Sequence, residues 1–171
     1  MSRYTLPLCS FSRGGVQRLS GINTGISNGR HCNFDEVYIP IQQAFYDHYG
    51  YVLPYRNKSF KLTLPNGKVL SAKMCQDRGK ALQSNPNKEL GEWSFNKLNI
   101  SSGNTVTNQD LTKAGFYSVI LEEDGNCNFS MDVCKTKNTF QRLMKKPSIF
   151  LNIFYFIVIY ICIYFLKPIK S

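Results

Sequence analysis

The sequence predicts a mainly-β domain, a small barrel with a few short helices, followed by a tail of different composition. Two observations favour this fold class. Most of the body consists of short β-branched and aromatic segments separated by turns, and an Asn-Gly pair between two alternating segments is a strong local signal for a hairpin. The 171 residues are 43% hydrophobic, which suits one core. We expect a domain over residues 1–134, a basic linker over 135–148 and a hydrophobic segment over 149–166.

The expected strands are short and separated by residues typical of turns. In chain order they cover residues 4–9, 36–41, 60–64, 68–74, 116–123 and 127–133. The third and fourth flank the turn Pro65-Asn66-Gly67, and the last two flank Asp124-Gly125-Asn126. Residues 10–30 are rich in Gly, Ser, Asn and Arg, which is typical of a long exposed loop that approaches a ligand closely.

Three short helices are expected between these strands. They cover residues 42–49, 89–98 and 109–114. The second has an apolar face that includes Trp93. The third begins at a cap provided by Thr107 or Asn108 and ends at Gly115.

The net charge of +10 is concentrated in the tail. Residues 1–134 carry 14 basic and 11 acidic side chains, a net of +3, whereas residues 135–171 carry 7 basic side chains and no acidic one. A mildly basic body with a strongly basic tail suits either nucleic acid or an anionic membrane surface, and charge alone does not choose between them.

The tail itself has two interpretations. Residues 149–166 are 18 residues without a charge and with one polar interruption, Asn152, which just reaches the length of a transmembrane helix. Five basic residues precede this segment and two follow it, so the positive-inside rule would keep the body in the cytoplasm, anchored to the inner face of the membrane. The alternative is a frameshift or read-through product, because Ile, Phe, Tyr, Asn and Lys are the residues that AT-rich codons specify.

No pattern in the chain is typical of a catalytic centre. Neither His31 nor His48 has Lys two positions later, as a phospholipase-D-type phosphodiesterase requires, and none of the 11 acidic residues has Lys at the spacing of common metal-dependent nucleases. Phosphate-binding glycine motifs are absent, and the six cysteines contain no C-x-x-C pair. We therefore expect no catalytic residue, cofactor or metal ion, and free, mostly buried thiols in a reducing cytoplasm.

Two polar segments, residues 20–33 and 75–88, are explained neither by a core nor by catalysis. Each mixes amide and cationic side chains with glycines. Asn and Gln can pair bidentately with adenine and Arg with guanine, while Lys and backbone N–H groups hold phosphate. Two such loops on a rigid barrel could grip a DNA duplex from both sides of a groove, and the alternative is two solvated loops.

The chain also resembles a known family. The motifs on which the resemblance rests are, in chain order, Ser20-Gly21-Ile22-Asn23-x-Gly25, residues 35–41, Gln76-x-x-Gly79-Lys80-Ala81, residues 87–93 and Met131-Asp132. They resemble the B3-like DNA-binding domain at the C-terminus of NgoFVII-type restriction endonucleases, over about residues 4–133. Two departures are Thr24, where family members usually carry Trp, and the absence of an Arg near Phe95, and both weaken the expected binding.

The resemblance implies a seven-stranded open pseudobarrel with short helices and two arms that enter the major groove. The first arm covers residues 20–33 and the second about 76–88. The residues expected to contact DNA are Asn23, Thr24, Arg30, Asn33, Gln76, Asp77, Arg78, Lys80, Asn85 and Lys88. Asp77 either accepts a hydrogen bond from cytosine or orients Arg78, and we favour orientation because phosphates repel a carboxylate.

In enzymes of this kind a separate phospholipase-D-type domain cuts the DNA. We expect this chain to be the sequence-specific double-stranded DNA-binding module without that catalytic domain, with a separate phospholipase-D-type nuclease subunit as a candidate partner. Two other interpretations stay open. One is a tail-anchored membrane protein whose barrel binds an unknown ligand, and the other is an enzyme with an unfamiliar centre.

Overall fold

The structure is a computed structural model that describes residues 2–10, 13–26, 33–56 and 58–135. Its elements, with η for 3-10 helices, are β1 (Arg3–Pro7), η1 (Gly21–Ile26), β2 (Ile39–Pro40), α1 (Gln43–Tyr49), β3 (Ser59–Thr63), β4 (Val69–Cys75), η2 (Asp77–Gly79), β5 (Ala81–Ser84), α2 (Lys88–Leu98), α3 (Asn108–Ala114), β6 (Ser118–Gly125) and β7 (Asn128–Cys134). The mainly-β class with short helices, expected from the sequence, is confirmed.

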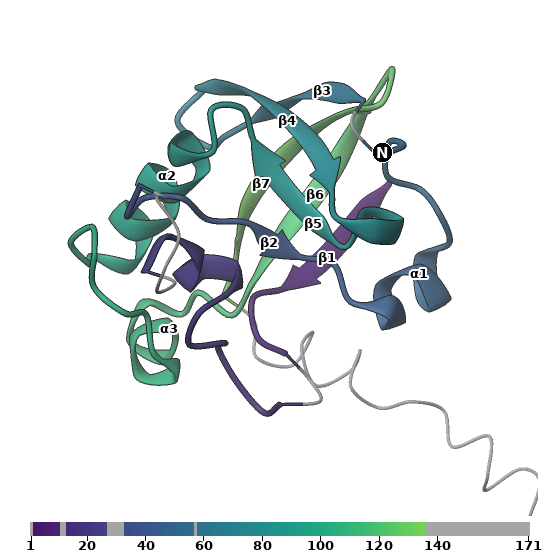
Figure 1. Cartoon of the computed structure of the whole chain (residues 1–171). Coiled ribbons are helices and arrows are strands. Elements are labelled where there is room, and N and C mark those ends of the chain that lie inside the picture. Colours follow the sequence, from purple (N-terminus) through teal and green to yellow (C-terminus); the bar gives the residue numbers. More distant parts are fainter. Residues whose placement is uncertain (1, 11–12, 27–32, 57, 136–171) are drawn as a thin grey trace, which may run out of the picture.

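The seven strands form one curled sheet in the order β1-β6-β7-β3-β4-β5-β2 (Figure 1). All neighbours are antiparallel except β3 and β7, which run parallel with Leu62 opposite Phe129. The edge strands β1 and β2 also contact each other, so the sheet curls into a half-barrel. This arrangement confirms the open pseudobarrel that the family resemblance implies.

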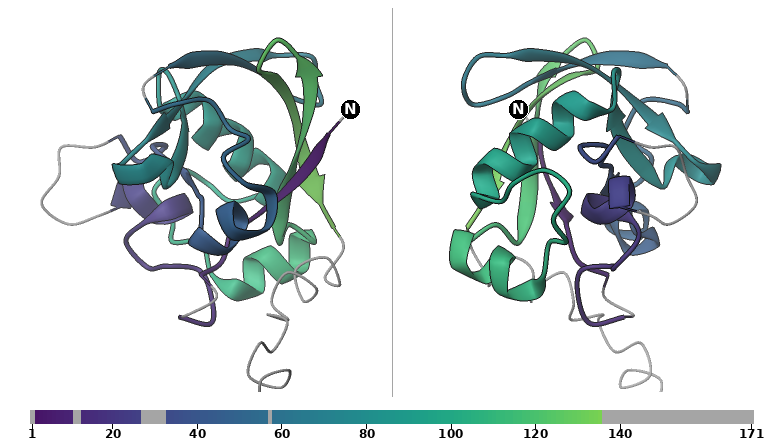
Figure 2. Two further views of the ribbon diagram at one scale, coloured as in Figure 1. Left: turned by 90° about the vertical axis from the view of Figure 1, so that its right-hand side faces the viewer. Right: turned by 60° about the vertical axis from the view of Figure 1, so that its left-hand side comes forward.

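The core lies on the concave side of the sheet, against α2 (Figure 2). Strands β3 and β4 alternate exposed and buried residues, so that Leu62, Leu70 and Met74 are fully buried. Trp93 of α2 packs edge-on against Phe116 with ring centroids 5.6 Å apart. Burial of these side chains stabilises the fold by roughly 1.5–3 kcal/mol each.

Both predicted hairpins are present, with one difference in the second turn. The Pro65-Asn66-Gly67 turn joins β3 to β4, and the Asn66 carboxamide oxygen accepts a hydrogen bond from the Lys68 N–H at 3.1 Å. The turn between β6 and β7 is centred on Asn126 and Cys127, both with positive φ, rather than on residues 124–126. Two successive positive φ angles are typical of a type I′ hairpin turn, and a register shift after Glu123 moves the turn along the chain.

The expected strand over residues 36–41 is reduced to the two residues of β2. The residues before it use their backbone groups elsewhere, because the Glu36 carbonyl accepts from the Gly25 N–H and the Tyr38 N–H donates to the Gly21 carbonyl. The prediction was therefore wrong for Ile41 and for residues 36–38, which belong to the base of the first polar segment.

The three expected helices are confirmed within a residue or two. The side chain of Thr107 caps α3 and forms a reciprocal capping box with Asp110. Gly115 ends the helix in the left-handed region with φ 64°. The Thr107 hydrogen bonds lower the pKa of the Asp110 carboxyl, since they stabilise its ionised form.

Four cysteines lie within the described residues, and Cys9, Cys75 and Cys127 among them are free thiols. Cys9 and Cys134 are buried, Cys75 is half-buried and Cys127 is exposed. Burial raises the pKa of the Cys9 thiol, so this side chain stays protonated at neutral pH.

The predicted linker over residues 135–148 lies outside the described residues except for Lys135, and the hydrophobic segment over 149–166 lies outside them entirely. Over the ranges that the structure covers, it contains no helix of the length and hydropathy needed to span a bilayer. The C-terminal hydrophobic helix therefore stays a prediction.

Candidate nucleic-acid interface

The first arm leaves the barrel through η1 and returns through residues 33–38 into β2. Its two limbs are joined by backbone hydrogen bonds of 2.9 Å from Gly25 to Glu36 and 3.2 Å from Tyr38 to Gly21. A Cβ atom at position 25 would collide with the carbonyl oxygens of the returning limb. The glycines of the Ser20–Gly25 motif therefore allow the two limbs to approach closely.

Hydrogen bonds of the Asn23 side chain join this arm to the rest of the domain. Its side-chain N–H₂ donates to the carbonyls of Gln17 and Val106 at 3.0 and 2.9 Å, and its side-chain oxygen accepts from the Val106 N–H at 2.8 Å. The side chain is only 2% exposed. Because its hydrogen bonds are made inside the protein, Asn23 is not free to contact a base, and we assign it a structural role.

Thr24 is also turned inward. Its hydroxyl donates to the Gly21 carbonyl at 2.9 Å, and the residue is buried. Thr24 and Asn23 thus both use their polar side chains inside the protein, and a contact of either residue with DNA stays a prediction.

Helix α2 supports the returning limb of the first arm. A Cβ atom at Gly91 would collide with the carbonyl of Asp35, so a larger residue in α2 would push the helix and the arm apart. Asn33 is exposed on this limb, and Arg30 lies outside the described residues. The position of the predicted Arg30 contact therefore stays a prediction.

The structure divides the predicted second arm into three parts. Residues 76–80 form a tight turn around η2, β5 lies inside the sheet between β4 and β2, and residues 85–87 lead into α2. The interpretation of 76–88 as one polar loop was wrong, because three of the four residues of β5 are buried. Four predicted contacts lie at one end of β5, namely Gln76, Asp77, Arg78 and Lys80, and two lie at the other, namely Asn85 and Lys88.

The turn at η2 has an unusual backbone. Gln76 has φ 61° and ψ 169°, a region that is almost exclusive to glycine, and Arg78 has φ 59° and ψ 25° in the left-handed region. Each such residue costs about 1–3 kcal/mol, and the conformation persists only where the surrounding structure holds it. Both side chains are exposed and make no hydrogen bond or ion pair with other described residues. A strained backbone that presents free polar side chains is typical of a binding site.

A hydrogen bond from Tyr46 of α1 stabilises this turn. Its hydroxyl donates to the Gly79 carbonyl at 2.8 Å, in a buried position. Desolvation by burial, and then the nearby Tyr51, raise the pKa of Tyr46, so the hydroxyl remains a donor at neutral pH. A backbone hydrogen bond of 2.8 Å from Ile41 to Lys80 ties the other side of the turn to the chain after β2.

Asp77 does not orient Arg78. Its carboxylate forms an ion pair with Arg56 at 3.0 Å, between side chains that are 54% and 89% exposed in the order Arg56, Asp77. This correction arises because Arg56, which precedes β3, is brought to the turn by the fold and not by sequence proximity. A pair this exposed contributes little stability, so its main effect is on position.

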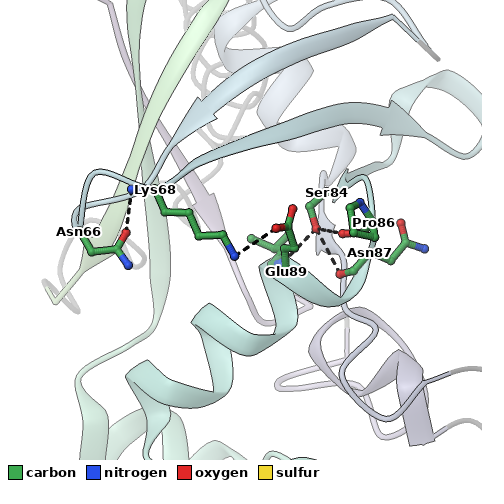
Figure 3. A network of polar contacts seen from close by, with 7 residues as sticks. Asn66, Lys68, Ser84, Pro86, Asn87 and Glu89 are labelled. Atoms are coloured by element: carbon green, nitrogen blue, oxygen red, sulfur yellow. Dashed lines mark hydrogen bonds and ion pairs between the residues drawn. The ribbon is translucent and has the colours of Figure 1, made fainter.

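At the other end of β5, a network of polar contacts joins the strand to α2 (Figure 3). The buried Ser84 hydroxyl accepts from the Leu90 N–H at 3.0 Å and lies 2.8 Å from the Pro86 carbonyl, to which it donates. Lys68 pairs with Glu89 at 3.1 Å. Sequence reasoning missed Ser84, since no spacing rule links a strand residue to a helix N–H six positions later.

Asn85 and Lys88 are exposed beside this network. Lys88 is the first residue of α2, and its ammonium group has no ion pair within the described residues. The network therefore fixes the backbone while both of these polar side chains remain accessible.

The predicted contacts at the two ends of β5 thus form two clusters, and the pairing of β2 with β5 sets the spacing between them. Ile39 lies opposite Leu82 and Pro40 opposite Ala81, so the first arm returns at the Ser84 end of β5 while η2 lies at its Ala81 end. Figure 1 shows η1 in purple at the left of this region and the turn between β4 and β5 at its right. A strand of four residues spans about 10–13 Å. The major groove of B-DNA is about 12 Å wide.

The described residues contain no group of three His, Cys, Asp or Glu side chains that could hold a metal ion. What the two ends of β5 present instead are amide and cationic side chains on a rigid, curled sheet.

Comparison with known proteins gives the family. The NgoFVII C-terminal B3-like DNA-binding domain matches residues 2–123, a range that contains both arms. The chain belongs to this family of restriction-enzyme domains, and it is a DNA-binding module. No curated protein matches the chain.

Proposed function

We propose that this protein binds double-stranded DNA sequence-specifically, with the two ends of β5 placed at opposite sides of the major groove. The observation that carries the proposal is the family match over both arms, together with the free Arg78 side chain on a strained turn. The family match supports DNA as the ligand, and the positions of the predicted contacts at the two ends of β5 support this direction of approach.

The exposed predicted contacts have the following chemical roles in this proposal. Arg78 pairs bidentately with guanine, and Gln76 with adenine, since both side chains extend from the η2 turn. Lys80 and Lys88 hold phosphates on either side of the groove. At the first arm, Asn33 contacts the duplex and Arg30 stays a predicted contact, while Asp77 acts only through Arg56.

The module does not cut DNA by itself in this proposal. Support comes from the absence of the His-x-Lys and acid-x-Lys spacings from the whole chain. Cleavage would come from a phospholipase-D-type nuclease subunit acting with it in a restriction system. Incubation of purified protein with supercoiled plasmid and Mg²⁺ tests this point, and nicking that a single substitution abolishes would overturn it.

Selection of bound sequences from random duplexes tests the binding proposal. The full chain should enrich one motif, and Arg78→Ala should lose preference at one position of it. Lys113→Ala is the matched control, because Lys113 is exposed on α3 and lies outside both clusters. Enrichment of no motif by the unaltered chain would contradict sequence-specific binding.

The hydrophobic segment over residues 149–166 supports a second proposal, that the chain is anchored at the inner face of the cytoplasmic membrane. Its length and lack of charge carry this proposal. The full chain should then sediment with membranes, whereas a chain ending at residue 134 should not. Equal sedimentation of the two chains would overturn the anchor.

A further inference from the structure

The segment between α1 and β3 exposes aromatic and cationic side chains beside the second arm. Tyr51 is 76% exposed and Tyr55 is 87% exposed. Arg56 and Lys58 are exposed in the same segment. We call Tyr51, Tyr55, Arg56 and Lys58 the flanking surface.

Two contacts fix the flanking surface against the η2 turn. Arg56 pairs with Asp77 at 3.0 Å, and the Tyr51 ring stacks on Tyr46 with centroids 4.9 Å apart and an interplanar angle of 22°. Tyr46 in turn donates to Gly79 of the same turn. The segment therefore lies on the side of the turn that faces away from η1 (Figure 1).

The segment is also anchored in the core. Leu53 is 9% exposed and belongs to the hydrophobic cluster, while the tyrosines two positions before and after it point outward. A backbone hydrogen bond of 3.1 Å from Lys58 to Tyr55 closes the segment into a turn. The two tyrosines are thus held outward by the fold, although burying them would be favourable.

The chemistry of the flanking surface suits phosphate. Tyrosine hydroxyls and Lys and Arg side chains are regular donors to DNA phosphates. The carboxylate of Asp77 is neutralised by Arg56, and Lys58 makes no ion pair with other described residues. An exposed group of aromatic and basic side chains that adjoins a DNA-reading turn therefore favours the same polyanion as its ligand.

We propose that the flanking surface binds the DNA backbone outside the base pairs that the two arms contact, on the side of η2. This inference rests on the proposed function. Tyr55 and Lys58 donate to successive phosphates of one strand, and Arg56 links this contact to the η2 turn through Asp77. The contacted phosphates lie about two to four base pairs beyond the base read by Arg78, given the reach of a few residues and 3.4 Å per base pair along a strand.

The test is a duplex-length series with the selected site. Flanks are lengthened base pair by base pair on one side at a time, and the affinity of the full chain is measured. Lengthening on one side should raise affinity by about three- to tenfold, the effect of two phosphate contacts, and lengthening on the other side should have no such effect.

The variant that removes the contact is Tyr55→Ala with Lys58→Ala. It should bind the shortest duplex as the unaltered chain does, lose the gain from the longer flank, and reduce the slope of log affinity against log salt by about one to two units. Val69→Ala with Lys113→Ala is the matched control, because it removes an exposed apolar side chain and an exposed cation elsewhere. Both altered sites are exposed, so unchanged thermal unfolding is expected for each double variant.

The outcomes separate this inference from the proposed function. If the unaltered chain binds no duplex, both are overturned. If it binds the selected site but the double variant keeps the one-sided gain, the flanking contact alone is overturned. Loss of self-association in the double variant, with the gain retained, would instead assign the tyrosines to a protein contact and would also overturn it.

Discussion

The hydroxyl of Tyr46 donates a hydrogen bond of 2.8 Å to the carbonyl oxygen of Gly79, which joins helix α1 to the strained turn that carries Arg78. These residues are 33 positions apart in the chain. Gln76 and Arg78 adopt positive φ angles that residues other than glycine rarely adopt. The contact matters because such a turn needs interactions with other parts of the protein to hold it. In the proposed function, base reading by Arg78 thus depends on Tyr46, a side chain to which we assign no contact with a base.

Replacement of Tyr46 by Phe should remove the hydrogen bond to the Gly79 carbonyl while keeping the aromatic ring. The ring packing remains, and loss of the hydrogen bond to the buried carbonyl should lower the free energy of unfolding by about 1–2 kcal/mol. Discrimination against single-base variants should fall more than affinity for random duplex, because the turn loosens while the lysines remain. Gln43→Ala, which removes an exposed side-chain contact to Asp47 from the same helix, is the control and should change neither.

The raised pKa of Tyr46 predicts that the folded protein loses stability at alkaline pH. Burial raises the pKa of Tyr46 above its ordinary value of 10.0, so the folded state holds this proton more tightly than the unfolded state. Its contribution is present below pH 10 and is lost as pH rises through the folded-state pKa. Urea unfolding at several pH values above 9.5 should therefore show a smaller decline for Tyr46→Phe than for the unaltered chain, and parallel declines would contradict the assignment.

Arg78 should tolerate glycine better than alanine in terms of stability. Its φ of 59° is unfavourable for any residue with a Cβ, so Arg78→Gly should be more stable than Arg78→Ala by about 1 kcal/mol. Both variants should lose preference at the same base pair, by about 1–3 kcal/mol. Thermal unfolding and affinity for single-base variants check the two parts, and equal stability of the variants would argue against the left-handed turn.

Gly91→Ala should destabilise the domain although alanine is the better helix former. The added methyl group meets the Asp35 carbonyl, and such overpacking typically costs about 1–3 kcal/mol. Asn96→Ala, at an exposed position of the same helix, is the control and should be neutral or slightly stabilising. Because Asp35 belongs to the returning limb of the first arm, the Gly91 variant should also bind DNA more weakly. A stabilised Gly91→Ala variant would contradict the close packing of α2 on this limb.

Local signals explain which parts of the fold could be predicted from the sequence. The Asn66-Gly67 turn, the Thr107 cap and the end of α3 at Gly115 depend on neighbouring residues, and all are present. The same holds for α1, whose limits depend on residues within one segment. The family resemblance added the seven-stranded open pseudobarrel, which local patterns do not contain, whereas the strand order came from the structure alone.

The site was harder to predict because its residues are placed by distant partners. The side-chain amide of Asn23 has the groups to pair with adenine, yet it is hydrogen-bonded to the backbone of Val106, 83 positions away. Ser84 has no functional pattern around it but joins β5 to α2. The division of the second arm follows from the pairing of β5 with two strands, and the partner of Asp77 comes from the chain before β3. A side chain's chemistry predicts what it can bind, whereas the fold decides whether it is free to do so.

The most direct test of the account compares Arg78→Ala with Lys88→Ala on a selected site and its single-base variants, at several salt concentrations. Arg78→Ala should lose preference at one base pair, and Lys88→Ala should weaken all duplexes alike and reduce the salt slope by about one unit. These two results would place base reading at η2 and phosphate binding at the start of α2. Unchanged affinity, base preference and salt slope in both variants would contradict the proposal that the two ends of β5 hold the duplex.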